Sequence, residues 1–177
     1  MSIITLGNIR AKEPCAPGWA KLTETLGTTV LTTELTIGDI LIANGLNDAL
    51  WALRCLPRRE AVAAVMPAVK RASVHTTDQR VHDCIAAVDS WLAGDDSVDL
   101  KTEAAAEAWV ASAGAASRAA CAAWAASAGA EAAEAARAAS AVSAAWVADA
   151  RATERNMQAS DLLAMFPPIR LKAEAAA

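Results

Sequence analysis

The segment from Ala104 to Ala152 is more than half alanine, and this composition restricts the fold more than any other feature of the chain. Alanine has the highest helix propensity and loses no side-chain rotamers on folding, so the segment is expected to be helical. The sequence WVASAGA at Trp109 recurs as WAASAGA at Trp124, which indicates repeated helical units. Because a methyl group buries little area, such helices are expected to pack with their backbones close together.

Helical signals also precede the alanine-rich segment. A first helix is expected after an Asn-Gly turn, with Asn47 or Asp48 as its cap and Pro57 as its end. A second helix is expected over residues 58–73, where Pro67 should introduce a kink or divide it. A third helix should begin after capping residues at 76–78 and stop near a glycine that ends the periodic pattern.

The first forty residues carry weaker signals. Residues 1–18 contain two glycines and two prolines and are expected to be irregular. Between residues 25 and 41, β-branched side chains alternate roughly with others, which favours a short strand or hairpin. Thr36 followed by Asp39 could equally open a helix.

These patterns predict an all-α fold in which an N-terminal helical unit precedes an alanine-rich, close-packed helical array, with one short N-terminal hairpin as the sheet. The expected division is an irregular arm over 1–34, the helical unit over 35–94, the array over 95–165 and a frayed tail over 166–177. Alanine faces bury little area within one chain, so a homo-oligomer is also expected, with its contact near residues 131–155.

Charge and composition limit the functional classes. The net charge is −4, with acidic and basic residues mixed along the chain, so direct binding of nucleic acid is not expected. Charged residues interrupt every apolar run before the ~20 residues that a membrane span requires, and the N-terminus lacks a secretion-signal pattern. A cytoplasmic protein without membrane contact is therefore expected. Cys15, Cys55, Cys84 and Cys121 form no CxxC pair and are expected to be free thiols, with two disulfides as the alternative.

The most informative candidate site combines Asn44, Asp48, Trp51 and Arg54. Three of these residues recur at a spacing of three within one predicted helix, and Arg54 is within reach of the Trp51 ring. They could form a polar patch with an aromatic anchor, which is typical of protein interfaces. Alternatively, Asp48 caps the helix, Trp51 lies in the core and Arg54 covers it.

Other candidate sites have simpler structural explanations. His75, Asp78 and His82 could share one helical face and bind a metal, but Asp78 also fits a helix cap beside two exposed histidines. Two carboxylate pairs occur four residues apart: Glu103 with Glu107, and Asp95 with Asp99. Such pairs could act as general acid and base, although acidic residues are also favoured at a helix start. No catalytic residue, metal or cofactor is therefore expected.

Two blocks of the sequence resemble a known family. These are LTIGDILIANGLNDALWALRCLP, from Leu35, and RVHDCIAAVDSWLAGDDSVDLKTEAAAEAW, from Arg80, followed by DARATERNMQASDLL, from Asp149. Together they resemble the immunity protein family of the Imm-5-like type, which bacteriophages and bacterial genomes often encode. The resemblance covers roughly residues 35–165. Members commonly carry denser tryptophan and arginine repeats, whereas serine and glycine replace several of them here.

The resemblance implies inhibition of a toxin or nuclease, and it leads to the expected function. We expect a non-enzymatic inhibitor that binds and blocks a protein target, such as a component of bacterial defence, with anti-CRISPR activity as one concrete form. The alternative is a structural homo-oligomerisation module without an inhibitory role. A weaker alternative is an enzyme or ligand-binding protein that uses the histidine face. The expected protein-binding residues are Asn44, Asp48, Trp51, Arg54, Glu107 and Trp109.

Overall fold

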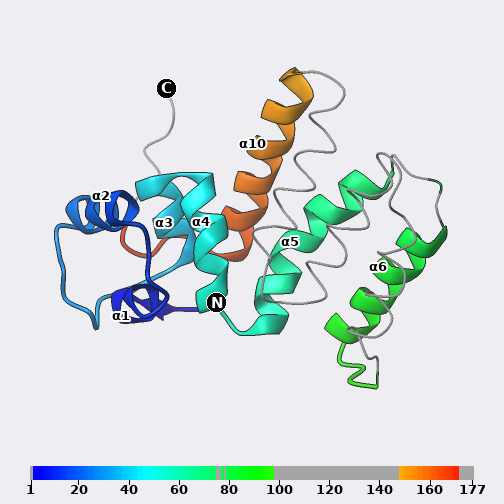
Figure 1. Ribbon diagram of the computed structural model, residues 1–177, viewed down its shortest axis with the longest axis horizontal. Coiled ribbons are helices and arrows are strands. Elements are labelled where there is room, and N and C mark those ends of the chain that lie inside the picture. The colour runs from blue at the N-terminus through cyan, green and yellow to red at the C-terminus, as the bar shows by residue number, and fades with distance from the viewer. Residues whose placement is uncertain (1, 75–76, 78, 98–147, 172–177) are drawn as a thin grey trace. The chain divides into compact units, whose positions relative to one another are not determined.

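The computed structural model describes residues 2–74, 77, 79–97 and 148–171 of the 177-residue chain (Figure 1). Within these residues lie seven α-helices, one 3-10 helix and two strands of two residues each, so the fold is all-α, as predicted. The chain divides into two units, which differ from the expected domains. Unit 1 consists of Met1–Pro57 and Ala159–Ala177, and unit 2 of Arg58–Gln158.

The N-terminal segment of unit 1 is regular, so the expected irregular arm over 1–34 is wrong. Its elements are β1 (Ile4–Thr5), α1 (Leu6–Arg10), α2 (Ala16–Leu26) and β2 (Glu34–Leu35). Thr5 and Asn8 form a capping box for α1: Asn8 N donates to Thr5 Oγ1 (3.1 Å) and Thr5 N donates to Asn8 Oδ1 (2.8 Å). A proline at the start of α2 has no backbone N–H to lose there, so it favours a helix rather than preventing one.

The short strand expected between residues 25 and 41 is β2, but its partner is not the neighbouring segment. It pairs antiparallel with β1, with Ile4 opposite Leu35, so the two strands do not form a hairpin. The helix that Thr36 and Asp39 could open is also present. It is α3 (Ile37–Asn44), whose N-terminus has a capping box between those two residues.

Two short helices follow one another around a single glycine. Gly45 has φ +90°, a conformation that side chains disfavour, and it both ends α3 and caps α4 (Leu46–Ala52). The predicted cap at Asn47 or Asp48 is therefore wrong, because the sharp turn starts α4 directly after Gly45. The helix continues as the 3-10 helix η1 (Leu53–Cys55) and ends before Pro57, as predicted.

The C-terminal segment completes unit 1, so the expected frayed tail over 166–177 is wrong for its described part. After α10 (Ala148–Met165), the chain returns to the start of α3, where the Asp39 side chain is fully buried. Asp39 Oδ1 accepts hydrogen bonds from Arg170 N (2.9 Å) and Leu171 N (2.8 Å), and Oδ2 accepts one from Ile169 N (3.2 Å). Asp39 thus satisfies three consecutive backbone N–H groups besides its part in the capping box.

Gly38 explains how closely the C-terminal segment approaches α3. A Cβ atom at this position would lie 2.1 Å from the carbonyl oxygen of Phe166 and 3.0 Å from the nitrogen of Pro168. No side chain fits against a backbone at such distances, so only glycine allows this contact. Phe166 itself is 3% exposed and belongs to the core of the molecule.

Unit 2 is built from α5 (Arg58–Ser73), α6 (Gln79–Leu92) and the part of α10 up to Gln158. The predicted bounds of α5 are confirmed, but the helix is not divided at Pro67. The predicted stop of α6 is also confirmed, because the helix ends two residues before Gly94, which has φ +109°. Apolar side chains spaced at helical intervals are buried at Ala61, Val62, Val65, Val69 and Ala72 on α5 and at Val81, Ile85 and Val88 on α6.

A buried ion pair links α5 to α10 within unit 2. Arg71 donates from Nε and Nη2 to the two carboxylate oxygens of Glu154, each over 2.9 Å, and the Glu154 side chain is only 4% exposed. Gln158 adds a hydrogen bond of 3.1 Å to Glu154 Oε1. The Glu154 carboxylate is therefore bonded to two side chains of the same unit.

Residues 98–147 lie outside the described residues, and with them most of the predicted alanine-rich array, including the repeats at Trp109 and Trp124. No helix in the described part of the chain combines the length and apolar character needed to cross a membrane.

Candidate functional site

Trp51 and Arg54 form an aromatic–cation pair at the end of α4. The Arg54 guanidinium carbon lies 4.6 Å from the centre of the Trp51 ring, and Arg54 Nε donates a hydrogen bond of 3.0 Å to Trp51 O. The predicted contact between these two residues is therefore present. Trp51 is half-buried and Arg54 is exposed, while the neighbouring Leu50 and Leu53 are buried in the core. The core side chains fix the helix, and the pair is presented at its surface.

Asn44 and Asp48 fix the position of α2 against α3 and α4. The Asn44 amide donates from Nδ2 to Gly18 O (2.8 Å) and to Asp48 Oδ2 (2.7 Å). The Asn44 Oδ1 atom is buried and has no hydrogen-bond partner among the described residues. The four predicted residues of this segment thus form two pairs. The Asn44–Asp48 pair joins α2, α3 and α4, and the Trp51–Arg54 pair lies at the surface.

A second aromatic–cation pair links α1 to α2. The Arg10 guanidinium carbon lies 5.2 Å from the centre of the Trp19 ring. Trp19 is half-buried and Arg10 is exposed, as in the first pair. A cation over an indole ring gains about 0.5–1 kcal/mol at an exposed site, and the stacking also restricts the arginine side chain.

The side of α4 that carries Trp51 can be identified from its neighbours. Asp48 and Trp51 are three residues apart on α4, so their side chains are neighbours on its surface. Asp48 lies against α2, because a Cβ atom at Gly18 would be 2.9 Å from Asp48 Oδ2. Cys55, the last residue of η1, donates a hydrogen bond to Asn8 O of α1, with its Sγ at 3.7 Å. Trp51 therefore lies next to the residue through which α4 meets α2, and Arg54 lies next to the residue through which η1 meets α1.

The two pairs are on elements that contact each other. Arg54 is adjacent to Cys55, whose thiol binds Asn8 O of α1, and Arg10 belongs to the same helix α1. We call Arg10, Trp19, Trp51 and Arg54 the tryptophan–arginine face. Its residues come from α1, α2, α4 and η1.

The cysteine next to this face is protected. Burial raises the pKa of the Cys55 thiol, and the nearby cations of Lys12 and Arg54 act in the opposite direction without cancelling the effect of burial. The thiol therefore stays protonated at neutral pH. Cys15, Cys55 and Cys84 are all free, as predicted, while Cys121 lies outside the described residues.

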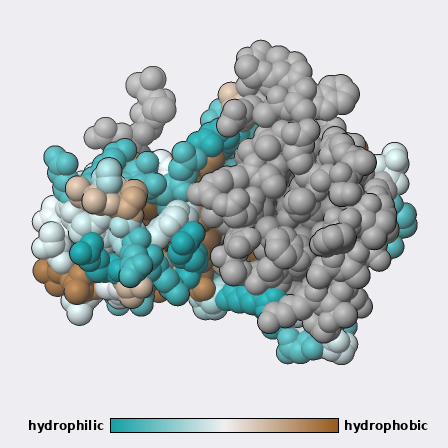
Figure 2. Space-filling model, in the orientation of Figure 1, coloured by the Kyte–Doolittle hydropathy of each residue, from teal (hydrophilic) through white to brown (hydrophobic). Residues whose placement is uncertain are grey.

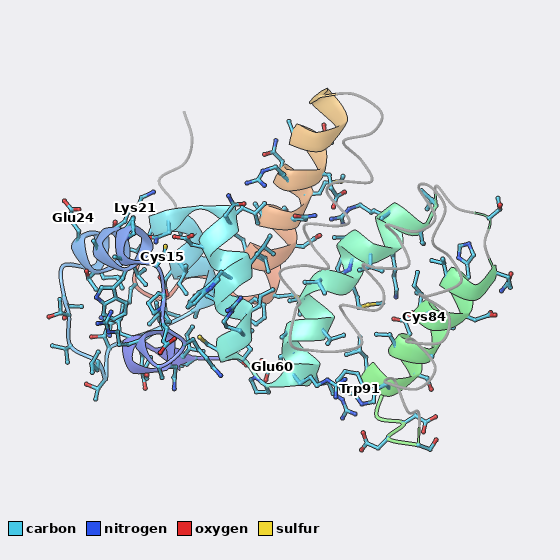
Figure 3. All side chains as sticks on the ribbon, viewed as in Figure 1. Cys15, Lys21, Glu24, Glu60, Cys84 and Trp91 are labelled. Atoms are coloured by element: carbon cyan, nitrogen blue, oxygen red, sulfur yellow. The ribbon has the colours of Figure 1, made fainter. Side chains whose placement is uncertain are left out.

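Unit 2 contains a third aromatic–cation cluster. Trp91 has Arg58 at 5.4 Å and Arg59 at 4.7 Å from its ring centre, and it lies between the start of α5 and the end of α6 (Figure 3). Arg59 also forms a 2.5 Å ion pair with Asp96. Both arginines thus contact a ring that packs between two helices, and the charge of Arg59 is already neutralised.

An apolar patch occupies another part of the surface of unit 1. Figure 2 shows it at the lower left edge, over the loop between α2 and β2. Val30 is 60% exposed and Leu31 is 51% exposed there. Two exposed apolar residues are common on protein surfaces and do not by themselves indicate a binding site.

The remaining predicted sites lie largely outside the described residues. This applies to Glu107 and Trp109, to the pair partners Asp99 and Glu103, and to His75 and Asp78 of the possible metal face. His82 is exposed on α6. The part of the chain that the structure describes holds no group of three or more histidine, cysteine or acidic side chains suited to a metal ion.

Half of the tryptophan–arginine face is not predicted from the sequence. Arg10 and Trp19 belong to the segment that was expected to be irregular, and a turn separates them, so no helical spacing relates them. The capping box of Thr5 and Asn8 was the one local signal that could have placed Arg10 at a helix end.

Comparison with protein-family models, with curated proteins and with solved structures finds no match to this chain.

Proposed function

We propose that the protein is a non-enzymatic binding protein that blocks a protein partner by occupying its working surface with the tryptophan–arginine face. The observation that carries this proposal is the occurrence in unit 1 of two half-buried tryptophan rings, each beneath an exposed guanidinium, on elements that the Cys55–Asn8 and Asn44–Gly18 hydrogen bonds join. Tryptophan and arginine are the residue types most enriched among the side chains that dominate binding energy in protein interfaces.

The rigidity of the face supports the same role. The Asn44–Gly18 hydrogen bond joins α3 to α2, the Cys55–Asn8 hydrogen bond joins η1 to α1, and buried leucines anchor α4. Each immobilised side chain costs about 0.5–1.5 kcal/mol on binding, and this cost is smaller where a ring and a guanidinium are already stacked. The blocking role follows from the resemblance to immunity proteins, whose implied action is to cover a partner.

The experiment starts from capture of a partner from a lysate of the cells that encode the chain, followed by calorimetry with the purified partner. We expect Trp51→Ala to weaken binding by about 2 kcal/mol or more while the far-UV circular dichroism spectrum is unchanged. Trp91→Ala is the matched control, because Trp91 is also half-buried beneath arginines but lies in unit 2. Arg54→Ala tests the face without removing a partly buried ring.

Two results would show that the proposal is wrong. In the first, the partner binds Trp51→Ala and Arg54→Ala as tightly as the unaltered protein. In the second, light scattering shows that these substitutions convert an oligomer into monomers, so that the face joins copies of the chain, which is the alternative expected from the sequence.

A further inference from the structure

The cations at the tryptophan–arginine face have no acidic partners in the described part of the chain. Arg10, Lys12 and Arg54 are all exposed, and none of them forms an ion pair there. In unit 2, by contrast, Arg59, Lys70 and Arg71 bind Asp96, Asp89 and Glu154. The positive charges beside the two tryptophan rings are therefore not neutralised by ion pairs in the described part of the chain.

Lys12 and Arg54 lie close together, and Arg10 is on the helix that precedes Lys12. The Cys55–Asn8 contact brings the end of α4 and η1 beside α1, and Lys12 follows α1 directly. Lys12 and Arg54 both act on the pKa of the Cys55 thiol, which burial raises, so their charges lie near the same sulfur atom. The acidic residues on these elements are Glu13 and Asp48, and the Asp48 carboxylate accepts a hydrogen bond from Asn44.

We propose, on the basis of the function proposed above, that the tryptophan–arginine face binds an acidic segment of its partner in which apolar side chains alternate with carboxylates. The exposed guanidiniums and Lys12 would pair with the carboxylates, since arginine matches a carboxylate in a two-bond geometry. The edges of the Trp19 and Trp51 rings would contact the apolar side chains between them. The charge complementarity determines the choice of partner and accelerates association.

A peptide fits these charges better than a nucleic acid. A nucleic-acid surface usually engages many cations, because each phosphate contact releases a counterion and adds to the affinity. The face offers three cations in a chain whose net charge is −4, so a long run of phosphates would be repelled by the rest of the molecule. A short acidic peptide, in contrast, can be bound by the three cations of the face alone.

The test uses the full chain and three synthetic probes, measured by calorimetry. The first is a short peptide in which glutamates alternate with leucines, the second has glutamine in place of each glutamate, and the third is an oligothymidylate of the same length. We expect the acidic peptide to bind, and its affinity to fall about tenfold or more in the triple variant Arg10→Gln, Lys12→Gln, Arg54→Gln. The affinity should also fall as salt is added.

Lys21→Gln is the matched control, because it removes one exposed cation of unit 1 from a different place. Lys21 lies on the side of α2 that faces away from α1 (Figure 3). We expect this variant to bind the acidic peptide as the unaltered protein does. The single variant Arg54→Gln removes the same charge from the face and should weaken binding. An equal loss in Lys21→Gln and Arg54→Gln would mean that only overall charge matters, and the inference would be wrong.

The remaining outcomes separate this inference from the proposed function. Equal affinity for the acidic and the glutamine peptide, or no binding of the acidic peptide, would show that the face does not recognise an acidic segment. The proposed function would still be supported if Trp51→Ala no longer binds the captured partner. Tighter binding of the oligothymidylate than of either peptide would overturn the inference in favour of a nucleic-acid surface.

Discussion

A single buried carboxylate, Asp39, links the start of α3 to the end of the described chain. It accepts hydrogen bonds from the backbone of three consecutive residues, Ile169 to Leu171, and from Thr36. A hydrogen bond to a charged group contributes about 1.5–3 kcal/mol, and a buried donor left without an acceptor costs a similar amount. Asp39 and the glycine before it therefore decide whether the C-terminal segment can pack at all.

Asp39 should also determine part of the stability of unit 1 in acid. Burial raises the pKa of Asp39, but the backbone N–H groups of Leu171, Thr36, Arg170 and Ile169 outweigh burial and hold its pKa below the ordinary value. The folded pKa is thus lower than the unfolded pKa of about 3.9, so protonation favours unfolding. The stabilisation is present above about pH 4 and is lost as the pH falls through the folded pKa.

Asp39→Asn tests this role. An amide can accept through one oxygen only and turns its NH₂ group toward other donors, so we expect a loss of about 3 kcal/mol or more at pH 7. Between pH 5 and 3, the free energy of unfolding should fall less in the variant than in the unaltered protein, because the amide does not titrate. Urea denaturation at several pH values measures both effects, and hydrogen exchange should show faster exchange at the amides of Ile169 to Leu171. Parallel pH profiles for the two proteins would contradict this assignment.

At the scale of elements, the features that could be predicted from the sequence depend on residues that are close together in the chain. The capping box of Thr36 and Asp39, the bounds of α5 and the stop before Gly94 all depend on neighbouring residues, and each was predictable. The return of residues 166–171 was not, because its donors are backbone N–H groups, which every residue except proline carries. Likewise, the capping pattern identified Asp39 as a helix-start residue but gave no sign of its distant partners.

Residues 166–171, which the sequence predicts to be part of a frayed tail, can be tested directly by truncation. We expect a chain truncated after Met165 to lose the stability of unit 1, because Asp39 loses three donors and the buried Phe166 is removed. Truncation after Leu171 is the control, since it keeps every described contact of the segment. Similar urea denaturation midpoints for both truncated chains and the full chain would show that the segment does not stabilise unit 1.

The contact between α5 and α10 predicts a strong coupling between two side chains. Arg71 and Glu154 form two hydrogen bonds of 2.9 Å, with side chains 28% and 4% exposed. We expect Glu154→Gln to cost about 3 kcal/mol, because it leaves a partly buried guanidinium without its counter-charge. A double-mutant cycle with Arg71→Met should show that the two losses are far from additive.

The Arg59–Asp96 pair provides the control for this cycle. Its side chains are 41% and 80% exposed, so solvent screens the charges and the coupling should stay below about 1 kcal/mol. Equal coupling energies for the two pairs would contradict the view that burial makes the Arg71–Glu154 contact strong.

At the scale of the whole molecule, the two units differ in how they use positive charge. Arg59, Lys70 and Arg71 of unit 2 are paired with carboxylates of the same unit, whereas Arg10, Lys12 and Arg54 form no ion pair among the described residues. Trp19, Trp51 and Trp91 are all half-buried beside arginines, but the Trp91 cluster includes an arginine that is itself paired with a carboxylate.

The central claim is that this face blocks a protein partner by stoichiometric binding. The most direct measurement titrates the activity of the captured partner against the purified protein at a partner concentration well above the dissociation constant. We predict that inhibition rises linearly and saturates at a fixed molar ratio, and that the Trp51→Ala curve is shifted to higher protein concentrations. If trace amounts of the protein inactivate an excess of the partner, the protein acts by turnover and the claim is wrong.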